Sequence, residues 1–281
     1  MVVGDNKLPK EARTVSTTAL RLSSVFLGRT KASLVLERNF LVYRHLWVIV
    51  FSGFFEPLFY LFAARVGLGE LVGNVRDGAG RPIGYTEFVA PALLAASAMN
   101  GVVYESTMNI FFKLKYAKTY DAMLATPLGP FDIAVGEIAW SLMRGAIYAA
   151  GFLLVMWATG LVRSPWAVMA LPAASLVGFA FAAVGMAATS FMRSWQDFDM
   201  VNLAVLVLFL FSATFFPLSV YPENIRFLAQ LSPLYHGISL IRGLTLGHIH
   251  LGLLGHATFL AVMGAAGLAV TRWRLTRLLL R

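Results

Sequence analysis

Long apolar segments recur along this chain, and their length decides what it can fold into. A helix needs ~20 mostly apolar residues to cross the ~30 Å of hydrocarbon in a bilayer. Six segments meet this condition: residues 46–64, 88–111, 133–159, 166–190, 201–217 and 251–271. Only 13% of the residues are charged and 58% are hydrophobic, a balance typical of proteins in lipid. The sequence therefore predicts an all-α membrane protein with six transmembrane helices.

Basic residues flank this apolar body. Eight of the 23 Lys and Arg residues precede Trp47, and four more lie within the last ten residues. Over residues 20–43 apolar and basic residues alternate, which is typical of an amphipathic helix on a membrane surface. We therefore divide the chain into a cytoplasmic N-terminal segment with an interfacial helix (1–45), a transmembrane domain (46–271) and a basic cytoplasmic tail (272–281).

The distribution of Lys and Arg predicts the orientation. If the N-terminus lies inside, the cytoplasmic segments carry 16 of these residues and the outer segments carry 6. Cytoplasmic loops are the ones enriched in Lys and Arg, so both termini are expected in the cytoplasm. The net charge of +9 could also suggest a nucleic-acid partner, but its position beside the spans indicates topology signals and contacts with membrane lipids. We predict no nucleic-acid partner.

The stretch between the fifth and sixth spans, residues 218–250, is too apolar for an ordinary loop. Prolines break it into short pieces, which predicts a re-entrant helical pair that dips into the outer leaflet. Irregular backbone is tolerated at that depth where protein or a cavity buries it. The residues that mark this external element are Pro217, Pro222, Pro233, His236 and Arg242.

Four ionisable residues fall inside predicted spans: Glu56, Glu105, Glu137 and Arg144. A charge at the bilayer centre costs at least ~2.5–3.5 kcal/mol, so each should have a partner. Glu137 and Arg144 share one helix face about 10 Å apart, and an antiparallel hairpin brings Glu105 near both. These charges form either a structural ion pair or a proton relay or cargo contact. Glu56 precedes Pro57, whose kink could line a cavity, although a neighbouring helix could equally satisfy the acid.

The sequence contains no Gly-x-x-x-x-Gly-Lys-Ser/Thr phosphate loop, since no Gly is followed by Lys. No cofactor is therefore expected in this chain, and any ATP and Mg²⁺ must bind to a partner. Cysteine is absent, which excludes thiolate metal sites. His248, His250 and His256 form an H-x-H-x5-H array without nearby acids, which we interpret as an interfacial loop with no metal site.

The loop between the second and third spans is the most informative polar stretch. Thr119 or Asp121 could cap a short helix there, and Pro127 and Pro130 would end it. Such a helix, bracketed by two spans and apolar on one side, is typical of a docking element for a cytosolic partner. The alternative is a surface helix that rests on lipid headgroups. The candidate docking residues are Tyr120, Asp121, Met123, Leu124, Thr126 and Pro127.

Three stretches give the chain a family resemblance. They are residues 36–44 (LERNFLVYR), residues 119–127 (TYDAMLATP) with Gly136-Glu137 after them, and residues 215–222 (FFPLSVYP) followed by residues 232–243 (SPLYHGISLIRG). In this order, with six spans, they resemble the ABC-2 type transporter permeases. Within that family the chain is most similar to the lipo-oligosaccharide (nodulation-factor) and drug-resistance exporters. The resemblance runs from about residue 30 to the C-terminus.

The resemblance implies a permease subunit in the bacterial inner (plasma) membrane that pairs with a second copy of itself. The loop after the second span would be the coupling helix that sits in a cleft of a separate ABC ATPase subunit. Residues 218–250 would close the pathway on the outside. Such a permease moves an amphipathic or hydrophobic cargo, such as a drug, lipid, glycolipid or lipo-oligosaccharide, out of the cytoplasm or inner leaflet, and is not itself an enzyme.

Two other classes remain open at the level of sequence. An integral-membrane enzyme that modifies lipids would need an acid, base or nucleophile set near one interface. The candidates Glu105, Glu137 and Arg144 instead lie within the apolar zone without a histidine. A passive membrane scaffold is the other alternative.

Overall fold

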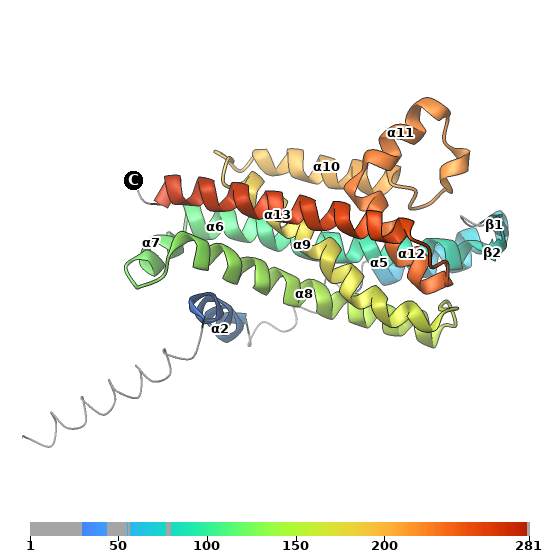
Figure 1. Ribbon diagram of the computed structural model, residues 1–281, viewed down its shortest axis with the longest axis horizontal. Coiled ribbons are helices and arrows are strands. Elements are labelled where there is room, and N and C mark those ends of the chain that lie inside the picture. The colour runs from blue at the N-terminus through green and yellow to red at the C-terminus, as the bar shows by residue number, and fades with distance from the viewer. Residues whose placement is uncertain (1–29, 44–54, 56, 77–79, 280–281) are drawn as a thin grey trace, which may run out of the picture.

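The structure is a computed structural model that describes residues 30–43, 55, 57–76 and 80–279. Its long helices run side by side along the longest axis of the molecule (Figure 1). These helices are made up of the elements α5 (Tyr85–Tyr104), η2 (Glu105–Asn109), α6 (Ile110–Lys115), α8 (Pro130–Ala158), η3 (Pro165–Met169), α9 (Ala170–Thr189), α10 (Asp197–Phe211) and α13 (Gly252–Leu279). The elements α5, η2 and α6 follow one another without a break and form one helix of 31 residues.

Within the described ranges, four helices are long and apolar enough to cross a membrane. They are Tyr85–Lys115, Pro130–Ala158, Pro165–Thr189 and Gly252–Leu279, and they coincide to within one residue with or extend beyond the predicted second, third, fourth and sixth spans. The fifth predicted span coincides with α10, which has only 15 residues. Most of the first predicted span, 46–64, lies outside the described residues. The fold is thus a mostly helical membrane protein with four candidate spans, and the count of six stays a prediction.

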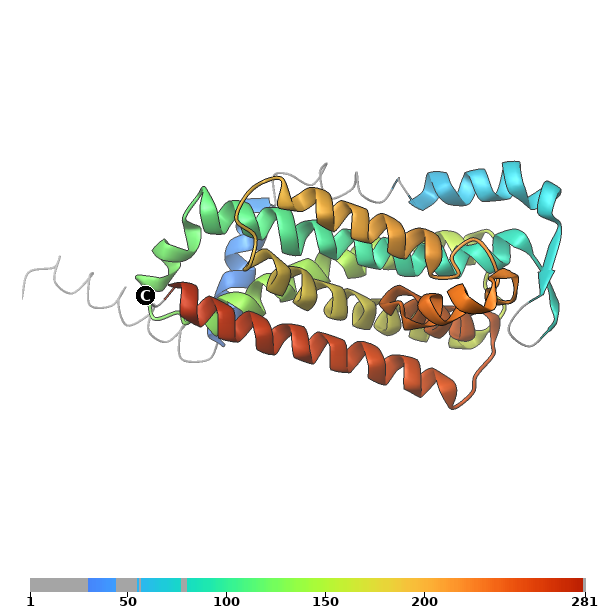
Figure 2. The same cartoon turned by 90° about the horizontal axis from the view of Figure 1, so that it is seen from above.

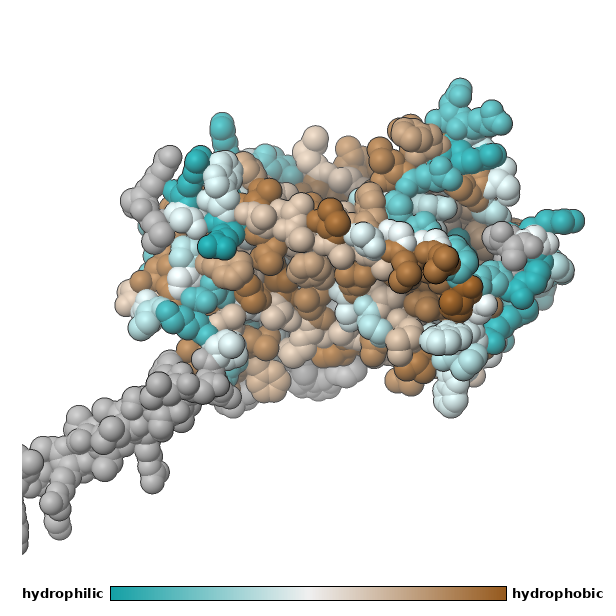
Figure 3. Space-filling view, viewed as in Figure 1, coloured by the Kyte–Doolittle hydropathy of each residue, from teal (hydrophilic) through white to brown (hydrophobic). Residues whose placement is uncertain are grey.

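The surface agrees with a membrane protein that spans along its long axis. Apolar residues cover the middle of the molecule and hydrophilic residues gather at its two ends (Figure 3). Large apolar side chains point outward from the long helices, among them Leu154, Trp157 and Val262 with 62–73% of their surface exposed. Such exposure is unfavourable in water and ordinary in lipid.

The helix α9 lies at the centre of the bundle, where it packs against α5, α8, α12 and α13. Small residues make this possible because they let helix backbones approach closely. At Gly267 of α13, an added Cβ would lie 2.8 Å from the main chain of Ala183 in α9. The remaining space is filled by buried apolar side chains such as Phe152 and Met186.

One end of the bundle carries α7 (Thr119–Leu124) and the C-terminal end of α13 (Figure 1). The helix α2 (Lys31–Tyr43) lies near this end and runs across the bundle, end-on in Figure 1 and lengthwise in Figure 2. This direction fits the predicted interfacial helix. The helix α13 continues to Leu279 through the predicted tail at 272–281, because no Gly or Pro follows Gly267 to end it.

The opposite end carries a two-stranded antiparallel hairpin, β1 (Asn74–Arg76) with β2 (Pro82–Gly84), in which Val75 pairs with Ile83. A helical segment, 57–63, leads into it through the π-helical turn η1 (Ala64–Leu68) and α4 (Gly69–Val72). The same end contains η4 (Leu218–Val220), α11 (Glu223–Leu231) and α12 (Pro233–Leu246). Pro217, Pro222 and Pro233 each stand at the start of one of these three elements. Their depth in a bilayer stays a prediction.

The contact between α2 and α8 depends on one glycine, and this can be tested. A Cβ on Gly136 would lie 2.5 Å from the Val35 Cβ and 2.8 Å from the Ala32 carbonyl oxygen. We expect Gly136→Ala to push α2 away and to lower the free energy of unfolding by about 1–3 kcal/mol. Thermal unfolding of the purified protein in detergent measures this. Gly255→Ala is the control, because its Cβ meets nothing within 4 Å; equal losses in both variants would contradict the packing.

Candidate functional site

A buried ion pair joins the second and third predicted spans. Glu105 and Arg144 have side chains only 2% and 9% exposed, and Arg144 Nη1 donates a hydrogen bond to Glu105 Oε2. The other carboxylate oxygen, Oε1, accepts from Trp140 Nε1 at 3.1 Å and also from the Asn109 amide. The second guanidinium nitrogen, Nη2, donates to the Tyr148 hydroxyl at 3.1 Å. The pair is therefore well supplied with hydrogen bonds, as a buried charge requires.

Local helix geometry places Glu105 in this network. Residues Glu105–Asn109 form a π-helical turn inside the long helix, so one extra residue is accommodated in that turn. Both ends of the turn then contribute to the same cluster, since Asn109 donates to Glu105 as well as to the Tyr43 hydroxyl of α2. A π-turn costs hydrogen-bond quality, and such turns occur frequently at functional sites.

A second buried pair lies closer to α7. Lys113 Nζ is 2.8 Å from Glu137 Oε2, and the two side chains are 8% and 1% exposed. Asn39 of α2 donates to the same oxygen at 3.0 Å. The prediction that Glu137 would lie with Glu105 and Arg144 is therefore incomplete, because its partner is Lys113. The long helix continues through α6, so Lys113 remains in the bundle although the charge count assigned it to a loop.

The short helix α7 is anchored to this second pair. Tyr120 is 1% exposed and lies beside Glu137. Burial, together with the Glu137 carboxylate, raises the pKa of Tyr120 well above its ordinary value. Met123 is also buried, 8% exposed, so it does not form the outward apolar face that the sequence suggested. The outward residues of α7 and the turn after it are Asp121, Ala122, Ala125, Thr126 and Pro127, while Leu124 is half-buried.

The ends of α7 differ from the expected ones. No side chain caps its N-terminus, neither Thr119 nor Asp121, and Lys118 enters the helix with a left-handed φ of 46°. The helix ends at Leu124, before Pro127. Pro130 is the first residue of α8, where a missing N–H costs nothing. The loop is thus a tight connection between two long helices.

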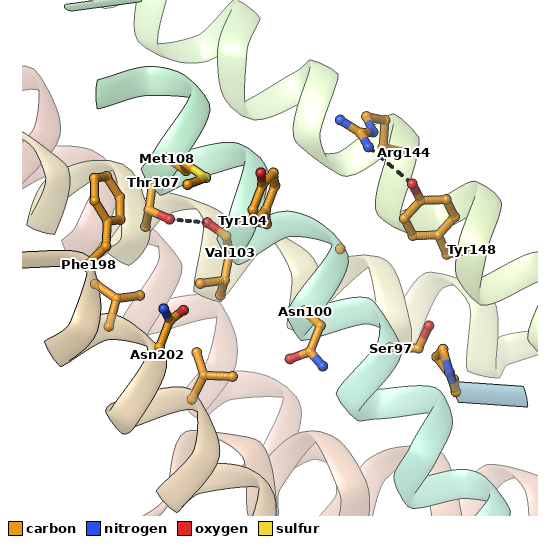
Figure 4. A pocket seen from close by; sticks show the side chains of 14 residues that line it. Ser97, Asn100, Val103, Tyr104, Thr107, Met108, Arg144, Tyr148, Phe198 and Asn202 are labelled. Carbon is orange, nitrogen blue, oxygen red and sulfur yellow. Dashed lines mark hydrogen bonds between the residues drawn. The ribbon is translucent and has the colours of Figure 1, made fainter. Parts of the chain in front are cut away.

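A cavity of about 480 Å³ opens beside the Glu105–Arg144 pair. Asn100 of α5 and Asn202 of α10 reach toward it from two sides, and Arg144 and Tyr148 of α8 approach it from a third (Figure 4). Three lining atoms are buried without a hydrogen-bond partner in the described part of the chain: Ser97 Oγ, Asn100 Oδ1 and Arg144 Nε. The remaining lining is largely apolar and aromatic, including Tyr104, Met108, Phe198, Val201 and Val205.

At the opposite end, Arg242 of α12 holds three elements together. Its Nε donates to the Phe88 carbonyl of α5 at 3.2 Å, and its Nη2 donates to the Ala213 carbonyl after α10 at 3.0 Å. The guanidinium also lies 3.9 Å from the centre of the Phe88 ring. Ala213 has a φ of 58°, a strained value for a residue with a Cβ, so this carbonyl contact stabilises a tight turn.

The remaining predicted site residues are dispersed. Glu56 lies outside the described residues. His236 of α12 contacts His256 of α13, with Nδ1 to Nδ1 at 2.7 Å. His248 and His250 lie in the loop that connects these helices. Among the residues that the structure describes, no three His, Cys, Asp or Glu side chains are placed to hold a metal ion. The sequence did not single out Asn39, Asn109, Lys113, Trp140 or Tyr148 as members of the buried network.

A bundle with outward apolar helices, buried ion pairs and a polar cavity is the fold of a polytopic membrane protein. The family model of the ABC-2 type transporter matches residues 30–246. The chain belongs to this family.

The chain is also similar to curated proteins named Nodulation protein J. That of Rhizobium leguminosarum bv. trifolii is 35% identical over 216 residues, 76% of this chain and 80% of the relative. That of Rhizobium leguminosarum bv. viciae is 32% identical over 251 residues, 86% of this chain and 94% of the relative. That of Rhizobium meliloti (strain 1021) is 30% identical over 223 residues, 78% and 83% of the two chains.

These relationships place the chain among membrane permeases and not among enzymes. Membership of the family implies, in general, an ABC ATPase as partner. Both buried carboxylates, Glu105 and Glu137, are paired with cations.

The two ion pairs predict a specific pattern of rescue. Arg144→Leu should lower the free energy of unfolding by about 3–5 kcal/mol, because it leaves the Glu105 carboxylate buried and unpaired. Adding Glu105→Leu should restore part of this loss. Adding Glu137→Gln should not, since the partner of Glu137 is Lys113. The measurement is thermal unfolding of the single and double variants in detergent. Rescue by Glu137→Gln, or no rescue by Glu105→Leu, would contradict the observed pairing.

Proposed function

We propose that this chain is the membrane-spanning subunit of an ABC exporter, driven by a separate ATPase that docks on α7. The observation that carries the proposal is the burial of Tyr120 beside Glu137: the helix that would face the cytosolic partner packs next to charged residues inside the bundle. The same polypeptide would have six spans and both termini in the cytoplasm of a bacterial inner membrane, as the Lys and Arg distribution predicts. ATP and Mg²⁺ would bind to the ATPase alone.

A continuous set of contacts leads from α7 to the cavity. Tyr120 lies beside Glu137 on α8, which pairs with Lys113. One turn further along α8, Trp140 donates to Glu105, and one more turn along, Arg144 pairs with Glu105 and lines the cavity. Displacement of α7 would therefore shift the buried face of α8 relative to α5. This supports a mechanical route from ATP binding on the partner to the cargo site.

The cavity supports an amphipathic cargo whose polar part carries no net charge. Glu105 neutralises Arg144, so the lining presents hydrogen-bonding groups without an excess of either charge. The Asn100 Oδ1 atom accepts from hydroxyl or amide donors, and Arg144 Nε donates to an oxygen. Apolar and aromatic lining residues suit a hydrocarbon chain or a sugar face. Of the cargo classes that the sequence left open, this lining therefore favours glycolipids and lipo-oligosaccharides over drugs and simple lipids.

A second copy of the permease would cover the open side of the cavity. Among the described residues, the helix α10 makes few contacts with other elements, and its Asn202 is exposed beside the cavity. A polar side chain at membrane depth is unfavourable unless protein or water surrounds it. Pairing of two copies through α10 would enclose both cavities and give the cargo a common path.

The docking face of α7 can be tested with a surface charge. Ala122→Arg changes an exposed residue that has no role in the core. We expect it to abolish co-purification with the ATPase and to reduce export, because an interface core residue is often worth 2 kcal/mol or more and a charge there is desolvated. Unfolding temperature should stay within error of the wild type. The matched control is Thr276→Arg, which adds the same charge at the same end of the bundle on α13. Full ATPase binding by Ala122→Arg would refute docking on α7.

The cavity can be tested independently of docking. Asn100→Leu keeps the volume and removes the buried carbonyl oxygen. We expect the concentration of glycolipid that half-maximally stimulates ATP hydrolysis to rise about two- to tenfold, the worth of one hydrogen bond. The assay uses permease and ATPase reconstituted in nanodiscs. Val205→Ile, an apolar change in the same lining, is the control. An unchanged response of Asn100→Leu would exclude this cavity as the site of the cargo's polar group.

A further inference from the structure

Two histidines from different helices meet at the end of the bundle that lies away from α7. His236 belongs to the second turn of α12, and His256 to the second turn of α13. Their Nδ1 atoms are 2.7 Å apart and their ring centres 4.9 Å apart. Both rings are half-buried, so they are held in place yet remain accessible. The interaction joins residues 20 positions apart, which no local spacing rule in the sequence reveals.

Neighbouring groups fix the orientation of these rings. Phe259 stacks on the His236 ring at 3.9 Å between centres, with the planes 20° apart. Tyr235 packs edge-on against the His256 ring at 5.9 Å. The main chain of Gln230 also interacts with the His236 ring. A metal-binding histidine is typically fixed by a hydrogen bond from its second nitrogen.

We propose that His236 and His256 bind a divalent transition-metal ion, with Zn²⁺ as its best representative, through their Nδ1 atoms. Neutral imidazole nitrogens are preferred ligands of Zn²⁺, Cu²⁺ and Ni²⁺, whereas Mg²⁺ and Ca²⁺ require oxygen ligands. Among the described residues, no carboxylate is among the groups that act on either ring; the titratable neighbours are the two rings themselves, His250 and Tyr235, whose ring packs against both. The site is therefore expected to bind Zn²⁺ in preference to Mg²⁺ or Ca²⁺.

Metal binding requires the two rings to give up the hydrogen bond between them without gaining or losing a proton. In the hydrogen bond between the rings, one Nδ1 donates and the other accepts. When the metal binds, the proton of the donating ring moves to Nε2 of that ring, and the two Nδ1 lone pairs coordinate the ion. Zn–N distances of about 2.0–2.1 Å in tetrahedral geometry separate the two nitrogens by about 3.3 Å. Small rotations of the two side chains achieve this. Water fills the other positions, so the site binds more weakly than a four-ligand structural site.

The consequence is a removable link between α12 and α13. The helix α12 also contacts α5 and the turn after α10 through Arg242. A bound ion would thus restrain the short helices that cover this end of the bundle. This inference does not rest on the proposed export function, because binding can be measured on the permease alone.

The experiment is a titration of the untagged, metal-stripped permease with Zn²⁺, by calorimetry and by thermal unfolding. An untagged chain is necessary because a polyhistidine tag would bind the ion. We expect saturable binding of one Zn²⁺ per chain, a rise in unfolding temperature, and no such response to Mg²⁺ or Ca²⁺. His236→Gln and His256→Gln should each weaken binding about tenfold or more. His250→Gln, in the adjoining loop, should bind as the wild type does.

A second pair of measurements guards against loss of fold. The metal-free variants should unfold within error of the metal-free wild type, and the double variant His236→Cys/His256→Cys should bind Cd²⁺ because thiolates prefer this softer ion. Absence of saturable Zn²⁺ binding by the wild type would overturn the proposal. So would binding by both glutamine variants that equals that of the wild type, which would reveal adventitious ions at other groups.

Discussion

The rest of the bundle is arranged around the buried pair of Glu105 and Arg144. A single charge at this depth is too costly to leave unpaired, so α5 and α8 must adopt a register that brings the two side chains together. The π-helical turn at Glu105–Asn109, the Trp140 indole and the Tyr148 hydroxyl all serve to satisfy this one ion pair. Ionic and hydrogen-bonded partners of this kind specify a unique register, which apolar packing alone does less sharply in lipid.

The helix α2 belongs to the same arrangement. It contributes Asn39 to the Lys113–Glu137 pair and Tyr43 to the Glu105 cluster. The Tyr43 ring packs 5.2 Å from the Trp140 ring, and the Arg144 guanidinium lies 5.8 Å from its centre. A helix that runs across the bundle is therefore attached to both charge pairs. Glycine at position 136 is what permits this close approach.

Part of this fold and of its buried charge network could be predicted from the sequence. The other part could not, for physical reasons. Hydropathy is a local property, so the segments that contain α5, α8, α9 and α13 were visible directly. The proximity of Glu105 and Arg144 follows from helix rise alone. Lys113 was misplaced because a charge count cannot tell that the helix continues past the π-turn. Met123 was assigned outward because the burial of α7 depends on α2 and α8, which no pattern in the loop reveals.

The pairs Lys113–Glu137 and Glu105–Arg144 lie at different positions along α8. Glu137 and Arg144 are seven residues apart, about 10 Å along the axis, on one face of a straight helix. The first is tied to α7 and α2, and the second to the π-turn and the cavity. A helix of 29 residues does not compress, so a displacement at the Glu137 end must appear as translation or tilt at Arg144. The π-turn opposite Arg144 departs from the regular hydrogen-bond pattern of the long helix. The cavity wall formed by Asn100 and Tyr104 immediately precedes that turn. Under the proposed coupling, motion of α7 would change the shape of the cavity through α8 and the π-turn.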